Sequence, residues 1–208
     1  MAELDPTDPS NGYEAVAKGY ISRGYRSSIG ASTIREWAKT LPQGATVLEL
    51  GCGSGAPISQ VLVDQGLSVY GVDASPSMIA AFRERFPEVH AECESVENSR
   101  FFGRAFDAVV AWGLMFLLQT DAQEKLIAKV SKAIEPGGRF VFTSPSQQCE
   151  WSDNLTGQTS HSLGGEEYRR LLASNGLIVE NETEDEGGNH YYFAVKGGKA
   201  GRRLGGRV

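Results

Sequence analysis

Two features of the chain, a glycine-rich turn and a later acid, have the residue types and spacing that bind a nucleoside. Residues 47–55 read Val-Leu-Glu-Leu-Gly-Cys-Gly-Ser-Gly, and a second apolar run ends at Asp73, eighteen residues after Gly55. Glycines let the backbone turn sharply and approach a ligand that a Cβ would hold away. An acid at the end of the next strand accepts hydrogen bonds from ribose hydroxyls. We therefore expect a nucleoside-binding site.

Glu49 narrows the class of ligand. It lies two residues before Gly51 and gives the pattern Glu-x-Gly-x-Gly-x-Gly. A carboxylate beside the turn repels the pyrophosphate of a dinucleotide but suits a cationic ligand. The alternative is that Glu49 only accepts backbone N–H bonds that hold the turn. The pattern resembles motif I of the class I S-adenosylmethionine (SAM)-dependent methyltransferases, and the SAM cofactor carries a cationic sulfonium and an ammonium.

The resemblance implies a set of cofactor contacts. Asp73 would bind both ribose hydroxyls, and Trp112 would either face the sulfonium through cation–π attraction or only fill the core. Glu94, with the backbone of Ser95, would accept from the adenine amino group, and Glu92 is the alternative. The expected cofactor-binding set is Glu49, Gly51, Cys52, Gly53, Ser54, Gly55, Asp73, Ala74, Met78, Glu94, Ser95, Trp112 and Gly113.

Methyl transfer of this kind asks the protein mainly to orient the acceptor and exclude water. A hydroxyl acceptor also needs a base or a metal, whereas an amine or thiolate needs little more than deprotonation. His190 is the first candidate for a base, because its unperturbed pKa is about 6.5, although a solvated histidine at a hairpin end is the alternative. Tyr20 is the second catalytic candidate. Other candidates near the acceptor are Tyr13, Arg23, Tyr25, Trp151, Asp153, Asn154, His161.

The residues after the fourth expected strand favour a small-molecule acceptor. They read Trp-Gly-Leu-Met-Phe-Leu (112–117) and lack the Asn/Asp-Pro-Pro-Tyr/Phe signature of enzymes that methylate nucleic acids or glutamine side chains. Two other functions stay open, a catalytically silent SAM-binding regulatory subunit and, less favoured, an NAD-dependent oxidoreductase. Against the latter, Gly55 follows Gly53 by two residues rather than the usual three.

Composition limits the partners and the compartment. The chain has 208 residues, a net charge of −6 and 40% hydrophobic residues, and no apolar run approaches the ~20 residues of a membrane span. An acidic body argues against a nucleic-acid partner. The polar N-terminus lacks the features of a signal peptide, and three cysteines fit a reducing compartment. We expect a cytoplasmic monomer or homodimer with no membrane partner.

The cysteines and the C-terminal tail leave two alternatives open. Cys52, Cys93 and Cys149 lack metal-ligand spacing, so we expect no metal, although some relatives methylate arsenite through three cysteines. Residues 196–208 carry five basic side chains and no acid. We expect 197–208 to be a disordered basic tail rather than a nucleic-acid arm.

The elements that must position these residues alternate along the chain. Apolar periodicity over 13–39, interrupted at Gly24 and Gly30, predicts two helices. The resemblance implies that they form a helical cap over about 10–39. The strands expected after the cap are 46–50, 68–72, 88–91, 106–112, 139–144, 177–184 and 190–196. The helices expected between them are 57–65, 75–86, 121–134 and 165–174, with loops at 92–104 and 145–163 and turns at 135–138 and 185–188.

This order predicts an α/β fold, a Rossmann-like doubly wound seven-stranded sheet with an antiparallel C-terminal hairpin. We expect a single methyltransferase domain over 1–196. In open sheets of this type, ligands bind outside the carboxyl ends of the strands, so the site residues should come from the loops that follow them.

Overall fold

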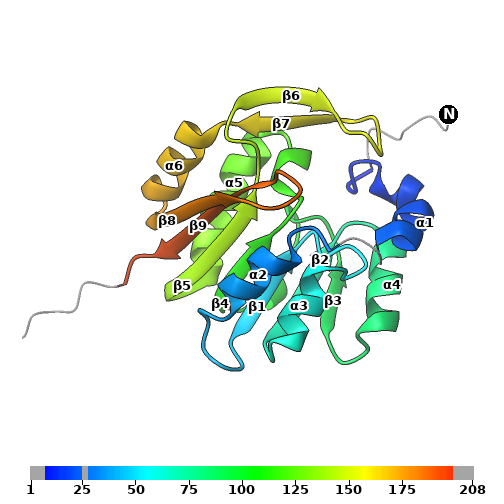
Figure 1. Cartoon of the computed structure of the whole chain (residues 1–208), viewed down its shortest axis with the longest axis horizontal. Coiled ribbons are helices and arrows are strands. Elements are labelled where there is room, and N and C mark those ends of the chain that lie inside the picture. The colour runs from blue at the N-terminus through cyan, green and yellow to red at the C-terminus, as the bar shows by residue number, and fades with distance from the viewer. Residues whose placement is uncertain (1–7, 25–27, 199–208) are drawn as a thin grey trace, which may run out of the picture.

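A seven-stranded sheet forms the centre of the molecule (Figure 1). The structure, a computed structural model, describes residues 8–24 and 28–198. Tyr25 and residues 199–208 of the expected tail lie outside the described residues, as does the side chain of Arg23. The strand order is β3-β2-β1-β4-β5-β9-β8, with the first five strands parallel and β9 antiparallel to both neighbours. These strands are β1 Thr46–Leu50, β2 Ser68–Asp73, β3 His90–Cys93, β4 Phe106–Ala111, β5 Ile134–Thr143, β8 Leu177–Glu184 and β9 His190–Lys196.

Helices cover both faces of the sheet, as the prediction of a doubly wound fold requires (Figure 1). Successive strand residues point to opposite faces, so Val110 packs with the core beneath α2 and α3, while Val109 packs with the core beneath α5 and α6. The helices are α1 Tyr13–Gly24, α2 Ala31–Ala38, α3 Ile58–Asp64, α4 Pro76–Arg85, α5 Thr120–Ala133 and α6 Gly165–Ser174, with short 3₁₀ turns η1 Phe101–Gly103 and η2 Met115–Leu117.

The direction of winding reverses beside β1. The chain proceeds outward from β1 to β3 and then returns to place β4 on the other side of β1, with Glu49 opposite both Gly71 and Val110. Such a switch point leaves a crevice at the carboxyl ends of the strands. Glu49 and Asp73 both lie at this edge because each is at or near the end of its strand.

The prediction of an irregular loop over 145–163 was wrong. These residues form a separate antiparallel hairpin, β6 Gln148–Ser152 with β7 Thr159–Leu163. Cys149 and Trp151 are half-buried between exposed polar neighbours, and the Trp151 ring lies 5.5 Å from that of Phe116 on η2. The hairpin therefore covers η2 rather than joining the main sheet. Each strand has only five residues, and β7 (Thr-Ser-His-Ser-Leu) has no period-two alternation, so the sequence gives little signal for the hairpin.

Smaller differences concern boundaries. The third strand is His90–Cys93 rather than 88–91. The predicted turn at 135–138 lies within β5, where Ile134 pairs with Phe106 before the register shifts. The C-terminal hairpin is confirmed, but its antiparallel strand β9 lies inside the sheet and β8 forms the edge. Among residues 8–24 and 28–198, no helix has the length and apolar character needed to cross a bilayer.

Candidate functional site

A cavity opens at the switch point, between the carboxyl ends of the strands and α1. Its empty volume is about 900 Å³, a figure that includes open solvent. Ten of the thirteen residues expected to bind cofactor line it, and so does Tyr20. Those ten are Glu49, Gly51, Cys52, Gly53, Asp73, Ala74, Met78, Ser95, Trp112 and Gly113.

Three residues of the expected set do not line the cavity. Gly55 has a φ of +84°, and a Cβ there would lie 2.4 Å from the Phe86 ring, so packing explains this glycine. Ser54 is buried behind the turn, and its Oγ has no partner among the described residues. Glu94 is exposed, and the acid of its loop that does line the cavity is Glu97.

The turn after β1 is held open toward the ligand space. Gly53 has a φ of +53°, and a Cβ built there would meet no atom within 4 Å. Its backbone N–H donates to the Asp73 carboxylate at 2.8 Å. Asp73 also accepts from the Ser75 backbone N–H at 2.9 Å, at the start of α4. One carboxylate therefore joins the glycine turn to the next helix.

Two acids, buried Glu49 and half-buried Asp73, give the cavity its electrostatic character. Glu49 is 3% exposed and accepts a hydrogen bond from Ser59 Oγ. Burial raises the pKa of Glu49 to about 8, and the charge of Asp73 acts in the same direction. Burial also raises the pKa of Asp73, against its two backbone hydrogen bonds. Among the described lining residues there is no lysine, arginine or histidine. A cationic ligand would compensate this lining.

The N-terminal cap closes one side of the cavity. Tyr13 and Tyr20 line it with their rings edge to face, 5.8 Å between centroids. Glu14 ties the cap to α4 by accepting from the hydroxyls of Ser75 and Ser77. Burial raises the pKa of Tyr20, and the charge of Asp73 adds to this effect.

The turn of the β6–β7 hairpin lies beside the N-terminal cap (Figure 1). Asp153, directly after β6, lies near enough to Tyr13 for its charge to act on the Tyr13 hydroxyl. Burial raises the pKa of Tyr13, and the charge of Asp153 adds to this effect. Two segments far apart in sequence thus meet beside the cavity that Tyr13 lines.

Trp112 lines the cavity, and a chain of hydrogen bonds on the side away from the cavity holds its indole ring in place. Its Nε1 donates to the Tyr191 hydroxyl at 2.6 Å, which in turn donates to Asp185 Oδ2 at 2.8 Å. Gly30 packs against this contact, since a Cβ there would lie 2.5 Å from the indole nitrogen. Trp112 therefore has both a packing role and a face on the ligand space.

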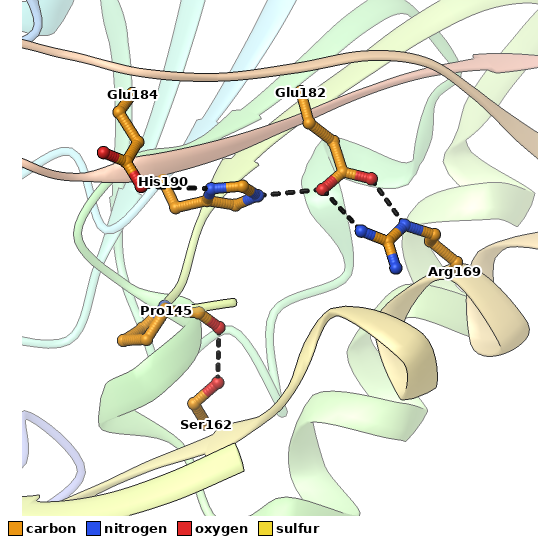
Figure 2. A network of polar contacts seen from close by, with 6 residues as sticks. All are labelled: Pro145, Ser162, Arg169, Glu182, Glu184 and His190. Atoms are coloured by element: carbon orange, nitrogen blue, oxygen red, sulfur yellow. Dashed lines mark hydrogen bonds and ion pairs between the residues drawn. The ribbon is translucent and has the colours of Figure 1, made fainter. Parts of the chain in front are cut away.

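His190 does not line the cavity, although it lies at the same edge of the sheet. Figure 2 shows its ring between two carboxylates, with Nε2 2.9 Å from Glu182 and Nδ1 3.7 Å from Glu184. Glu182 also forms an ion pair with Arg169. A general base must reach the proton that it removes, so the geometry lends no support to His190 as a base.

His161 and the cysteines are also away from a shared centre. His161 Nδ1 lies 3.1 Å from Glu150, and its Nε2 is buried without a partner among the described residues. Cys52 is buried, Cys93 exposed and Cys149 half-buried. In the part of the chain that the structure describes, no three side chains of His, Cys, Asp or Glu are grouped to hold a metal.

The sequence analysis missed Asn11. This residue lines the cavity, and its side-chain Nδ2 is buried with no partner among the described residues. Its φ is +52°, a left-handed conformation held by Asp8, whose carboxylate accepts from Ser10 and from Gly12 N. The Asn-Gly dipeptide before a helix predicts a turn at this position, but it does not predict that Asn11 lines the cavity.

Comparison with known proteins agrees with this geometry. Residues 47–138 match the family described as the methyltransferase domain. Aklanonic acid methyltransferase DauC of Streptomyces sp. (strain C5) is 34% identical over 111 residues, 49% of each chain. Cypemycin N-terminal methyltransferase of Streptomyces sp. is 31% identical over 147 residues, 68% of this chain and 60% of that protein. The chain spans about half the length of the curated relatives that it matches.

A solved structure shares the fold over nearly its whole length. Magnesium protoporphyrin IX methyltransferase from Synechocystis PCC 6803, with bound SAM, has a TM-score of 0.71 at 15% identity. The alignment covers 94% of this chain and 99% of that one. The chain therefore contains a segment, 47–138, that matches a methyltransferase domain, and its sheet has the fold of a solved methyltransferase with bound SAM.

Proposed function

We propose that the protein transfers a methyl group from SAM to an N, O or S atom of a small molecule. The observation that carries the proposal is the pair of acids, buried Glu49 and half-buried Asp73, beside a glycine turn at the switch point of the sheet. A pyrophosphate would meet repulsion there, whereas a ligand with a sulfonium and an ammonium would be stabilised. The relatives of this chain include N- and O-methyltransferases.

The roles that we propose for the cofactor contacts follow from this charge distribution. Asp73 uses its remaining lone pairs to accept from the ribose hydroxyls, and Glu49 compensates the positive charge. Ser95 and Glu97 contact the adenine side, and Trp112 presents its ring to the sulfonium. The unpartnered Asn11 amide donates to the methionyl carboxylate. The proposal treats 1–196 as one domain, with 10–39 as its cap.

When bound, SAM supplies a methyl group that its sulfonium activates for transfer. The residues of the chain position the acceptor and exclude water. Tyr13 and Tyr20 present hydroxyls to the cavity, and the contact between Tyr13 and Asp153 joins the cap to the hairpin beside it. These hydroxyls are the candidates for orienting the acceptor, in place of His190. A small-molecule acceptor, a cytoplasmic location and a monomer or homodimer are parts of this proposal.

Calorimetry with SAM, S-adenosylhomocysteine (SAH) and NAD tests the cofactor. We expect SAM and SAH to bind and NAD to show no heat of binding. NAD binding without SAH binding would favour an oxidoreductase and overturn the proposal. Transfer of tritium from SAM labelled in its methyl group to small amines, phenols and thiols then tests catalysis. SAH binding with no transfer to any of them would favour the regulatory subunit.

A further inference from the structure

We propose that the methyl acceptor of this site is an amine on a neutral or cationic molecule, and that the site rejects anionic acceptors. The inference rests on the proposed function and deepens it by naming the class of substrate. It is drawn from the charges that surround the ligand space and from the aromatic side chains that share its walls.

The ionisable side chains of the described cavity lining are all acids, tyrosines or a cysteine. Glu49, Asp73 and Glu97 supply the carboxylates. Among the described basic side chains, Lys129 contacts the segment that includes the lining residues Val96 and Glu97. Its ammonium donates to the backbone carbonyls of these two residues. Lys129 does not itself line the cavity and lies over the Phe101 ring, 4.3 Å from its centroid.

The cofactor alone does not balance this charge. SAM carries two cationic groups and one carboxylate, so it supplies one net positive charge against the lining carboxylates Asp73 and Glu97, to which Glu49 adds a third when it is ionised. A further anion would meet no lysine, arginine or histidine among the described lining residues, and an unpaired charge in such a site is costly. A cation or a neutral amine meets no such penalty.

The surroundings of the cavity add negative charge. The charge of Asp153 acts on Tyr13, a lining residue, so its carboxylate lies near the ligand space. Asp185 lies two hydrogen bonds away, behind Trp112 and Tyr191. A positively charged molecule is attracted to this cavity and an anion is repelled.

Aromatic rings form the uncharged part of the walls. Tyr13, Tyr20 and Trp112 line the cavity, and their ring faces attract cations. Acids together with aromatic rings are the combination that binds an ammonium group, whereas a carboxylate or phosphate needs arginine or lysine.

Transfer to an amine also balances without a catalytic base. A bound ammonium first loses one proton to water, and the freed nitrogen lone pair forms the N–C bond while the electrons of the C–S bond remain on sulfur. The product is a methylated ammonium and neutral SAH. The rate of methyl transfer should therefore rise with pH until the bound amine is deprotonated.

The test uses the full chain saturated with SAH, so that cofactor binding is established first. Matched probes share a carbon skeleton and differ in charge: 2-phenylethylamine against 3-phenylpropionate, and tyramine against 3-(4-hydroxyphenyl)propionate. We expect calorimetry to show each amine binding at least about tenfold more tightly than its carboxylate match, and the preference to shrink at high salt. In turnover with labelled SAM, tritium should enter the amines alone.

Asp153→Asn keeps the oxygen that caps the hairpin turn but removes the charge near the cavity. We expect it to lower the preference for amines about three- to tenfold and to leave the affinity for SAH unchanged. Asp64→Asn is the matched control, because Asp64 is an exposed acid at the end of α3, on the opposite edge of the sheet.

Two results would overturn the inference. One is a carboxylate probe that binds or is methylated as well as its amine match, and the other is a panel in which no amine binds the SAH-loaded protein. A failure to bind SAH is a different result, because it would remove the proposed function itself.

Discussion

Two groups of buried polar side chains lie at the carboxyl edge of the sheet, and they are partnered very differently. Tyr168 belongs to a network of neutral, hydrogen-bonded side chains: its hydroxyl donates to Gln123 Oε1 and contacts Ser144 Oγ, and Gln123 Nε2 donates to the carbonyls of Leu118 and His161. In the cavity, by contrast, Glu49 is an ionisable acid, and it accepts one hydrogen bond, from Ser59 Oγ.

The side chains around Tyr168 stabilise the fold, whereas the acids of the cavity are arranged to bind a ligand. A fully satisfied neutral network in a low-dielectric interior contributes stability and fixes one arrangement of its elements. Buried carboxylates without cationic partners destabilise the empty protein, and their cost is recovered when a compensating ligand binds. Substitutions in the first group should therefore change stability, and substitutions in the second should change ligand affinity.

The largest effect is expected at Asp73. Asp73→Ala removes the charge-assisted hydrogen bonds that we propose to the ribose and should weaken SAH binding by roughly 2–4 kcal/mol, measured by calorimetry. The variant also loses the contacts to Gly53 and Ser75. Asp73→Asn keeps an acceptor oxygen for those backbone groups and separates the two effects. An unchanged dissociation constant in both variants would show that another group binds the ribose.

Tyr168→Phe should show the opposite pattern. It removes the hydroxyl that is hydrogen-bonded to Gln123, to Ser144 and to the backbone N–H of Leu163. Buried polar atoms are then left without a partner. We expect the free energy of unfolding in urea to fall by about 1–3 kcal/mol. The affinity of the remaining folded protein for SAH should stay within about twofold of the wild type. A loss of affinity as large as that of Asp73→Ala would mean that the two regions are coupled.

Glu49 should link both properties to pH. Its folded pKa of about 8 lies above its ordinary value of 4.5, so the folded chain binds more protons than the unfolded chain between these values. The free energy of unfolding of the empty protein should therefore decrease as pH rises through this window. SAM favours the ionised carboxylate, so its affinity should increase with pH up to about 8, by at most about tenfold per unit. Glu49→Gln should flatten both profiles, as chemical denaturation and calorimetry from pH 6 to 9 would show.

The sequence predicted the half of the site that is encoded locally. Glu49, Gly53 and Asp73 lie in consecutive segments with strong apolar runs and a fixed order of turn and acid, so β1 and β2 bring them together. The same continuity predicted the seven strands of the sheet. No such local signal exists for the contact between Tyr13 and Asp153, which joins two distant segments through a short polar hairpin.

His190 shows a second limit of sequence reasoning. Alternate residues of β9 face opposite sides of the sheet, so Tyr191 contacts Trp112 while His190 packs beside Tyr192 and faces Glu182. Because His190 and Tyr191 are consecutive residues of β9, they face opposite sides of the sheet, and only Tyr191 lies on the side of Trp112 and the cavity. Glu97 in place of Glu94 is a similar case, since the loop after β3 has no periodicity to set the direction of its side chains.

The smallest effect is expected at Asn11, whose buried Nδ2 has no protein partner among the described residues. Asn11→Gly keeps the left-handed backbone at this position, because glycine adopts a positive φ readily, and removes only the amide. Loss of one hydrogen bond to a carboxylate should weaken SAH binding by about 1–2 kcal/mol. 5′-Methylthioadenosine lacks the amino-acid portion, so its affinity should not change. Equal weakening of both ligands would place Asn11 against the nucleoside, and no weakening of either would assign its amide to the methyl acceptor or to water.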